Sequence, residues 1–189
     1  MSFNMNLNNV KNEGGIYIKE NFFTKEQFDK IKNNFDNKEF YPHHQPEKYE
    51  CGNRFQAYPC YQFDDTNDTS LIIGNYFKTN FKDDFRVETT YRKVYSEELL
   101  KSKCNTRYGF IHKDGGLYET CIYAGVIYLD FTVTGGTAFF NAQSDKFPDI
   151  EIGAVPNRLI LYDNKRFHAP SHDFTYEVRK NICFFIYDK

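Results

Sequence analysis

Residues 106–114, TRYGFIHKD, followed by the apolar run CIYAGVIYLDF at residues 121–131, contain the pattern that decides the fold. Residues two apart in a strand face the same side, so His112 and Asp114 point the same way where the first segment ends. The second segment has the composition of a buried strand. An imidazole beside a carboxylate at a strand end can supply two ligands of a metal site.

A third ligand must come from a distant strand, and His168 is the candidate. It lies after the apolar strand RLILY, at residues 158–162, and the turn Asp163-Asn164. Two histidines and one carboxylate on one face of iron form the facial triad of non-haem Fe(II) oxygenases, which leaves coordination positions open. The pair H-x-D alone is common by chance, so the interpretation depends on the order of the motifs around it.

The second half of the chain has the pattern of consecutive strands. Turn residues such as Asp114-Gly115-Gly116 and Gly135-Gly136 separate several of them. No helix start follows Gly135-Gly136, which favours a tight turn over a phosphate-binding loop. The predicted strands are residues 85–95, 106–112, 120–131, 136–141, 149–152, 157–163 and 177–187.

The first half of the chain is predicted to support these strands. A short strand-like segment at residues 15–18 is followed by a helix whose capping box is Thr24 with Gln27, and a second helix is expected at residues 69–80. The region between them, residues 40–66, is long for a loop, which is typical of a functional or disordered segment. Two helices followed by about seven strands predict helices packed on a β-sandwich or barrel.

The ordered set of motifs resembles the prolyl-4-hydroxylase-like branch of the 2-oxoglutarate- and Fe(II)-dependent oxygenases. Over residues 85–189 the family pattern reads HxD, YLN, GGT-F, His and Arg, and residues 16–31 resemble its opening strand and helix loosely. Asp130 stands where the family often has Asn, and His168 and Arg179 are spaced a little more widely than in some relatives. The matching residues are His112, Asp114, Tyr128-Leu129-Asp130, Gly135-Gly136-Thr137-Ala138-Phe139, His168 and Arg179.

This resemblance implies a double-stranded β-helix, a mostly β jelly-roll or cupin-like barrel with supporting helices. It divides the chain into a flexible tail at residues 1–14 and a single domain at residues 15–189. Within that domain, residues 15–84 would provide helical support and a substrate-covering loop, and residues 85–189 the catalytic barrel.

The implied activity is that of a dioxygenase that hydroxylates an unactivated C–H bond and releases succinate and CO2. Fe(II) would be held by His112, Asp114 and His168, with 2-oxoglutarate and O2 as co-substrates and ascorbate as an auxiliary reductant. Arg179 would pair with the distal carboxylate of 2-oxoglutarate, since a guanidinium grips a carboxylate through two hydrogen bonds. Tyr128 would donate to the same carboxylate. Asn181 alternates with Arg179 and would line the pocket, as would Cys183.

Several residues compete for these roles. His172 is a rival metal ligand, but Pro170 prevents a helical turn that would align it with His168. Arg107 and Arg166 are weaker candidates for the anion anchor, because the first faces away from His112 and the second lies in a turn. The adjacent pair His43-His44 is interpreted as structural, and Tyr49, Arg54, Tyr58 and Tyr61 as possible substrate contacts that do not define the substrate.

Bulk composition limits the partners. The net charge is −2 with no basic block, so nucleic-acid binding is not expected. No secretion signal, membrane-spanning run or CxxC pair is evident, which favours a cytoplasmic protein. A peptide, a protein or a small molecule could be the substrate, and the oligomeric state is open. The alternatives are a non-catalytic metal- or ligand-binding β-barrel and a zinc or manganese barrel enzyme with hydrolytic or isomerase chemistry.

Overall fold

The computed structural model describes most of the barrel and its supporting helices. The described residues are 11–13, 15–42, 60–65, 68–79, 84–101, 107–108, 111–114, 120–130, 135–171 and 177–188. Within them no helix is long and apolar enough to cross a membrane.

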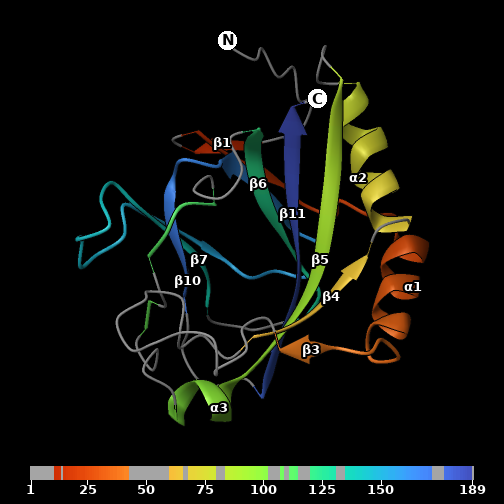
Figure 1. The fold of residues 1–189 in the computed structure, drawn as a ribbon, viewed down its shortest axis with the longest axis horizontal. Coiled ribbons are helices and arrows are strands. Elements are labelled where there is room, and N and C mark those ends of the chain that lie inside the picture. The colour runs from red at the N-terminus through yellow and green to blue at the C-terminus, as the bar shows by residue number, and fades with distance from the viewer. Residues whose placement is uncertain are drawn as a thin grey trace.

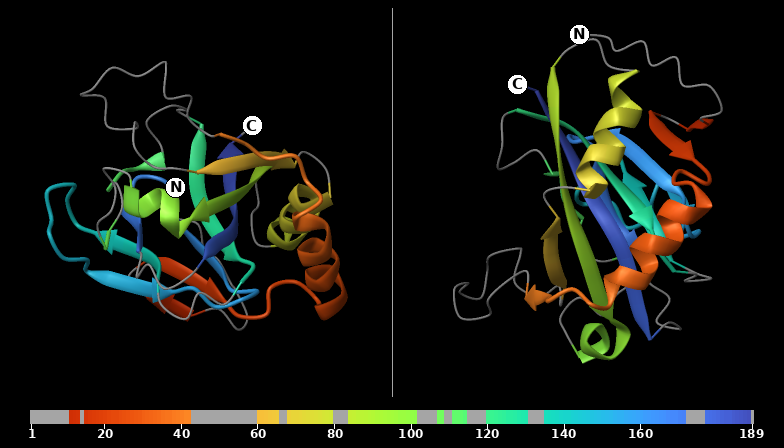
Figure 2. Two further views of the ribbon diagram at one scale, coloured as in Figure 1. Left: turned by 90° about the horizontal axis from the view of Figure 1, so that it is seen from below. Right: turned by 90° about the vertical axis from the view of Figure 1, so that its right-hand side faces the viewer.

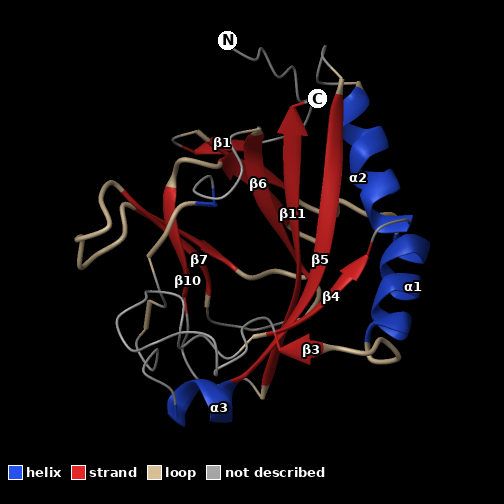
Figure 3. Cartoon of the chain, in the orientation of Figure 1, coloured by secondary structure: helices blue, strands red, loops and turns tan. Residues whose placement is uncertain are grey.

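Two antiparallel sheets face each other (Figures 1 and 3). The large sheet has eight strands in the order β1-β2-β9-β6-β11-β5-β4-β3, and the small sheet has the order β10-β7-β8. The large-sheet strands are β1 (Lys11–Glu13), β2 (Ile16–Lys19), β9 (Leu159–Asp163), β6 (Cys121–Tyr128), β11 (Val178–Asp188), β5 (Phe85–Tyr95), β4 (Tyr61–Asp65) and β3 (Tyr41–Pro42). The small-sheet strands are β10 (Phe167–Ser171), β7 (Gly136–Phe140) and β8 (Ile150–Gly153).

Helices α1 (Lys25–Phe35) and α2 (Asp68–Lys78) both cover the outer face of the large sheet, with α2 above α1 in Figure 1 (Figures 1 and 2). The first begins at the predicted capping box: the Thr24 hydroxyl accepts from the Gln27 amide, and the Gln27 side chain accepts from the Thr24 amide. A short helix, α3 (Ser96–Lys101), follows β5 directly.

Alternation along the strands divides the core into two layers. Ile127 of β6 belongs to the cluster between helices and large sheet, whereas Val126 and Tyr128 belong to the cluster between the two sheets. On β11, Ile182 faces the helices, and Arg179 and Asn181 face the barrel interior because they have the opposite parity. The inner face of the large sheet therefore carries polar groups into the barrel.

The predicted double-stranded β-helix is confirmed, and six predicted strands coincide with β5, β6, β7, β8, β9 and β11 within a few residues. The pattern missed β3, β4, α3 and β10, the strand that carries His168. Residues 11–13, predicted as part of a loose tail, instead form β1 and pair with β2. Residues 15–84 supply strands to the large sheet as well as helices.

The predicted strand at residues 106–112 falls partly outside the described residues. Its described part runs antiparallel to β10, through bridges from Tyr108 to Ser171 and from His112 to His168. This segment therefore continues the small sheet at the β10 edge.

Candidate active site

The structure brings together the three predicted metal ligands. Nε2 of His112 lies 3.6 Å from Oδ1 of Asp114, and Nε2 of His168 lies 3.3 Å from Oδ2 of the same carboxylate. One potential ligand atom from each residue falls within 4.8 Å of the other two. The backbones of the two histidines also pair, because each amide donates to the other's carbonyl at 2.9 Å.

The orientation of His168 suits a metal ligand. Its Nδ1 lies 3.1 Å from the carbonyl oxygen of Arg166. A carbonyl only accepts hydrogen bonds, so this contact places the imidazole proton on Nδ1 and leaves the lone pair of Nε2 directed at Asp114. Hydrogen bonds of this kind from the second ring nitrogen orient metal-bound histidines.

Two residues that the sequence interpretation did not assign to the site support Asp114. The Tyr162 hydroxyl donates to Oδ2 of Asp114 at 3.3 Å, and the backbone amide of Asp114 donates to the carbonyl of Asn164 at 3.1 Å. Asn164 is itself anchored, since its side chain donates to the carbonyl of Cys121. Side chains alternate between the two faces along the strand RLILY, and Tyr162 lies on the face that points into the barrel. This alternation could have identified Tyr162 as a residue near the site from the sequence.

Electrostatics keep Asp114 and His168 in the protonation states that metal binding requires. Burial alone raises the pKa of Asp114, but His168 and His112 outweigh it, so the pKa of this carboxyl lies well below its ordinary value. Burial lowers the pKa of His168 to about 4 despite the opposing charge of Asp114. At neutral pH the site therefore offers an ionised carboxylate and a neutral imidazole, the forms that coordinate metals. The donor set fits a divalent transition metal.

Arg179 lies in a buried polar cluster at the end of the small sheet. It is 5% exposed, and its guanidinium donates to the carbonyls of Gly136 at 2.8 Å and Ser171 at 3.2 Å. Tyr128 is buried beside it, with the guanidinium carbon 5.6 Å from the ring centre. The Tyr128 hydroxyl and the Thr137 hydroxyl form a hydrogen bond at 2.7 Å, which adds Thr137 to this cluster.

The strand register relates the three candidate metal ligands to Arg179. Ser171, whose carbonyl contacts Arg179, lies three residues beyond His168 on β10. At a rise of about 3.3 Å per residue, this places the guanidinium contact roughly 10 Å along the strand from the histidine. That separation is comparable to the reach of a five-carbon dicarboxylate with one end at a metal and the other at the arginine.

The remaining candidates differ in position. Asn181 is buried on the inner face, where its amide lies 3.2 Å from the sulfur of Cys183. Arg107 pairs with Glu151 at 3.3 Å and Arg166 pairs with Asp149 at 2.9 Å. Each of the two alternative anchors thus already has a carboxylate partner. His43, His44, Tyr49, Arg54, Tyr58, Gly115, Gly116 and His172 lie outside the described residues.

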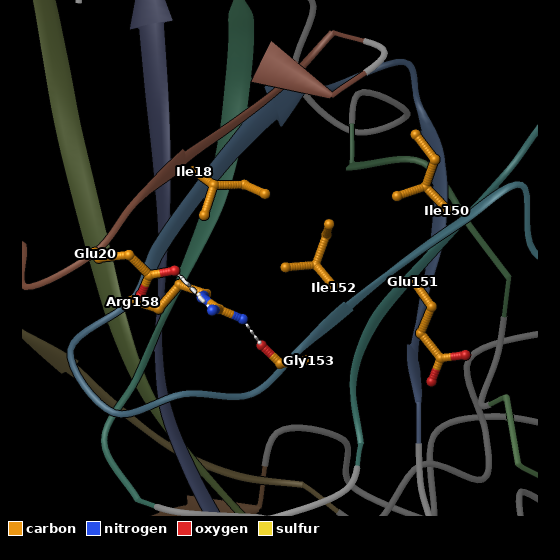
Figure 4. Close-up of a pocket in the computed structure, with 7 residues that line it drawn as sticks. All are labelled: Ile18, Glu20, Ile150, Glu151, Ile152, Gly153 and Arg158. Atoms are coloured by element: carbon orange, nitrogen blue, oxygen red, sulfur yellow. Dashed lines mark hydrogen bonds and ion pairs between the residues drawn. The ribbon is translucent and has the colours of Figure 1, made fainter. Parts of the chain in front are cut away.

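A hollow of about 340 Å³ lies between β2 and β8 (Figure 4). Its apolar lining includes Ile18, Ile150 and Ile152. At its rim Arg158 pairs with Glu20 at 2.6 Å. None of the three candidate metal ligands lines it, so it is distinct from the site described above.

The fold is that of solved 2-oxoglutarate-dependent oxygenases. A prolyl-4-hydroxylase from Pseudomonas putida matches with a TM-score of 0.62 and 8% identity, over 93% of each chain. HygX from Streptomyces hygroscopicus, solved with nickel, 2-oxoglutarate and hygromycin B, gives 0.61 and 10%, over 93% of this chain and 83% of that one. A Trichoplax adhaerens prolyl hydroxylase, solved with a hypoxia inducible factor peptide fragment, gives 0.64 and 12%, over 92% and 84%.

At sequence identities of 8–12%, the structural similarity establishes a shared fold. No protein-family model and no curated protein matches the chain.

Proposed function

We propose that this protein is an Fe(II)- and 2-oxoglutarate-dependent dioxygenase that hydroxylates an unactivated C–H bond. One observation carries the proposal: His112, Asp114 and His168 converge in the same barrel as the buried guanidinium of Arg179. A metal site alone would be compatible with hydrolytic or isomerase chemistry. A buried arginine at the distance of a dicarboxylate from that site is specifically useful to a 2-oxoglutarate enzyme.

The three ligands would hold Fe(II) on one face and leave its other positions open. When bound, Fe(II) supplies the redox chemistry by which O2 oxidises one substrate C–H bond to an alcohol and converts 2-oxoglutarate to succinate and CO2. The Arg166 carbonyl fixes the tautomer of His168, and the Tyr162 hydroxyl fixes the orientation of Asp114. Both contacts hold the ligands in place before a metal arrives.

Arg179 would bind the distal carboxylate of 2-oxoglutarate. Burial strengthens this ion pair because few waters compete for the charges. A guanidinium carries five N–H donors, so it can hold the backbone carbonyls of Gly136 and Ser171 and still present donors to a carboxylate. Tyr128 and Thr137 would contribute hydroxyls to the same pocket, and Asn181 would line it.

The similar structures were solved with a peptide fragment in one case and hygromycin B in another, so a peptidyl residue or a small molecule is the proposed substrate. We place the reaction in the cytoplasm, since Cys60, Cys121 and Cys183 are free thiols, as in reducing compartments. Ascorbate would serve as an auxiliary reductant.

The proposal is tested by measuring succinate formed from 2-oxoglutarate by protein loaded anaerobically with Fe(II) and then exposed to O2. With ascorbate present to supply the two electrons that reduce the remaining oxygen atom to water, the wild-type protein should release succinate slowly even without its substrate, and His168→Ala should abolish this release. Absence of succinate from the wild-type protein would favour a non-catalytic barrel. Succinate release that persists in His168→Ala at the wild-type rate would exclude this metal site.

The role of Arg179 needs a separate measurement. Arg179→Ala should weaken 2-oxoglutarate binding by at least about a hundredfold, because a charge-assisted bidentate contact is lost, and should leave metal affinity within about twofold. Arg107→Ala is the matched control, since Arg107 is exposed and pairs with Glu151. Equal 2-oxoglutarate affinity in Arg179→Ala and wild-type protein would exclude this anchor.

A further inference from the structure

The loop between β7 and β8 contacts both segments that carry the histidine ligands. It spans residues 141–149, between the end of β7 and the start of β8, and projects from the barrel (Figure 1). Two of its side chains make these contacts, one toward the segment of His112 and one toward the segment of His168. Each contact reaches its histidine through one intervening residue.

The first contact holds the peptide group that precedes His112. The side-chain amide of Gln143 donates to the carbonyl oxygen of Ile111 at 3.0 Å. The amide of His112, which belongs to the same peptide group, donates to the carbonyl of His168 at 2.9 Å. A peptide group is planar, and its N–H and C=O point in opposite directions. Gln143 and His168 therefore hold this plane from its two sides, and the plane sets the direction in which the His112 side chain leaves the backbone.

The second contact holds the residues beside His168. The guanidinium of Arg166 donates to Oδ2 of Asp149 at 2.9 Å, and the carbonyl oxygen of Arg166 accepts the hydrogen bond of Nδ1 of His168. The backbone amide of Asp149 also donates to the carbonyl of Phe139, the residue opposite His168 on β7. Asp149 is thus tied to the surroundings of His168 through both its side chain and its main chain.

Hydrogen bonds within the loop keep Gln143 in place. The Asp145 carboxylate accepts from the backbone amides of Asn141 at 3.1 Å and Ala142 at 2.7 Å. The amide of Asp145 in turn donates to the carbonyl of Ala142 at 3.2 Å. A carboxylate that accepts backbone amides in this way stabilises a turn. The backbone on both sides of Gln143 is therefore restrained, which directs its amide at Ile111.

We propose that Gln143 and Asp149 are positioning residues for the two histidine ligands, and that the β7–β8 loop holds His112 and His168 at the spacing that one metal ion requires. This inference rests on the proposed function, because it takes these histidines as ligands. Neither Gln143 nor Asp149 is itself a ligand. Partners outside the ligand set orient metal-binding histidines and raise metal affinity.

The test uses Co(II) as the probe metal, because its visible absorption depends on the arrangement of its ligands. Gln143→Met keeps the length of the side chain and removes its donor, and Asp149→Ala removes the carboxylate partner of Arg166. Each should weaken Co(II) binding about three- to tenfold and change the shape of the absorption, since outer partners contribute about ten- to a hundredfold to affinity and these act one residue further away. Asp149→Asn retains an acceptor for Arg166, so its Co(II) affinity should lie between those of the wild type and Asp149→Ala.

Two controls separate positioning from stability. Phe147→Ala changes the same loop at a side chain that is 81% exposed, and Asp29→Ala removes an exposed ion pair with Lys25 on α1. Both should bind Co(II) within about twofold of the wild type, with unchanged absorption. Because exposed ion pairs contribute little to stability, the Tm of metal-free Asp149→Ala should match that of Asp29→Ala. Unchanged Co(II) affinity and absorption in either Gln143→Met or Asp149→Ala would overturn the positioning role, as would an equal loss in Phe147→Ala.

These readouts do not require turnover. Failure of the proposed function would appear as a wild-type protein that binds Co(II) and forms no succinate with Fe(II). Failure of the positioning role would appear as unchanged Co(II) binding by the variants of a protein that does form succinate. A wild-type protein that binds no Co(II) would overturn both.

Discussion

Tyr162→Phe removes one hydroxyl from beside the candidate metal site and changes little else. The Tyr162 ring packs in the core between the sheets, with its centre 4.7 Å from that of His168 and 5.0 Å from that of Phe139, and phenylalanine keeps these contacts. Burial, and then the charge of Asp114, raises the pKa of Tyr162 well above its usual value. The hydroxyl therefore stays protonated and remains a donor to Asp114 throughout the neutral range.

The distance between the hydroxyl and Asp114 sets the expected size of the effect. A hydrogen bond to a charged group contributes about 1.5–3 kcal/mol. The contact of 3.3 Å is long for an O–H···O bond, so we expect the lower end, about 1.5 kcal/mol. Since about 1.4 kcal/mol corresponds to a tenfold change in Kd, Tyr162→Phe should weaken metal binding about tenfold.

The assay is anaerobic competition for Fe(II) between the protein and a chromophoric chelator at neutral pH. Circular dichroism and thermal melting verify that each variant is folded. Tyr128→Phe is the matched control for metal binding, because Tyr128 is a buried tyrosine of the same core whose hydroxyl bonds Thr137. Metal affinity of Tyr162→Phe within twofold of the wild type, or an equal loss in Tyr128→Phe, would refute the reasoning.

Three further predictions concern the frame of the barrel. Asn157→Ala removes two buried hydrogen bonds of the Asn157 side chain, one with the amide and one with the carbonyl of Phe23, each 2.8 Å long. It should lower the free energy of unfolding, measured in urea, by about 2–4 kcal/mol. A loss below about 0.5 kcal/mol would show that these two bonds do not stabilise the fold. Gly125→Ala would place a methyl group against the ring of Phe184. It should therefore lower the free energy of unfolding by about 1–3 kcal/mol and lower the Tm measured by calorimetry. An unchanged Tm would disprove this close approach. Burial raises the pKa of Cys60 to about 11, so little of this thiol is ionised at pH 8.5. Iodoacetamide at this pH should alkylate Cys60 about a hundredfold more slowly than an unhindered thiol of ordinary pKa. Peptide mass spectrometry follows the alkylation. Alkylation of folded protein at the ordinary rate would show that this thiol is accessible and ionised.

The sequence was most informative where local chemistry and long-range packing agree. The capping box at Thr24 depends on neighbouring residues alone, and the apolar runs that became β6 and β9 form strands buried on both faces. The convergence of His112, Asp114 and His168 could be predicted because the family resemblance supplied a long-range constraint that periodicity does not contain.

Other parts of the structure depend on tertiary contacts that leave little local pattern. Strand β10 contains Pro170 and polar residues, and it forms because it pairs with β7 on one side and with the segment of His112 on the other. Strands β3 and β4 are short and hold their places by pairing with each other and with β5. The interior position of Tyr162 follows from strand parity, but its relation to the metal ligands requires the assembled barrel.

The most direct test of the central claim is the visible absorption of the anaerobic protein titrated first with Fe(II) and then with 2-oxoglutarate. If His112, Asp114 and His168 bind the metal and Arg179 binds the co-substrate, a 2-oxoglutarate-dependent absorption band should develop and saturate at one equivalent of iron. The band should be absent in Asp114→Ala, and it should require much more 2-oxoglutarate in Arg179→Ala. A wild-type protein that binds Fe(II) and develops no such band would contradict the assignment of this barrel as a 2-oxoglutarate oxygenase.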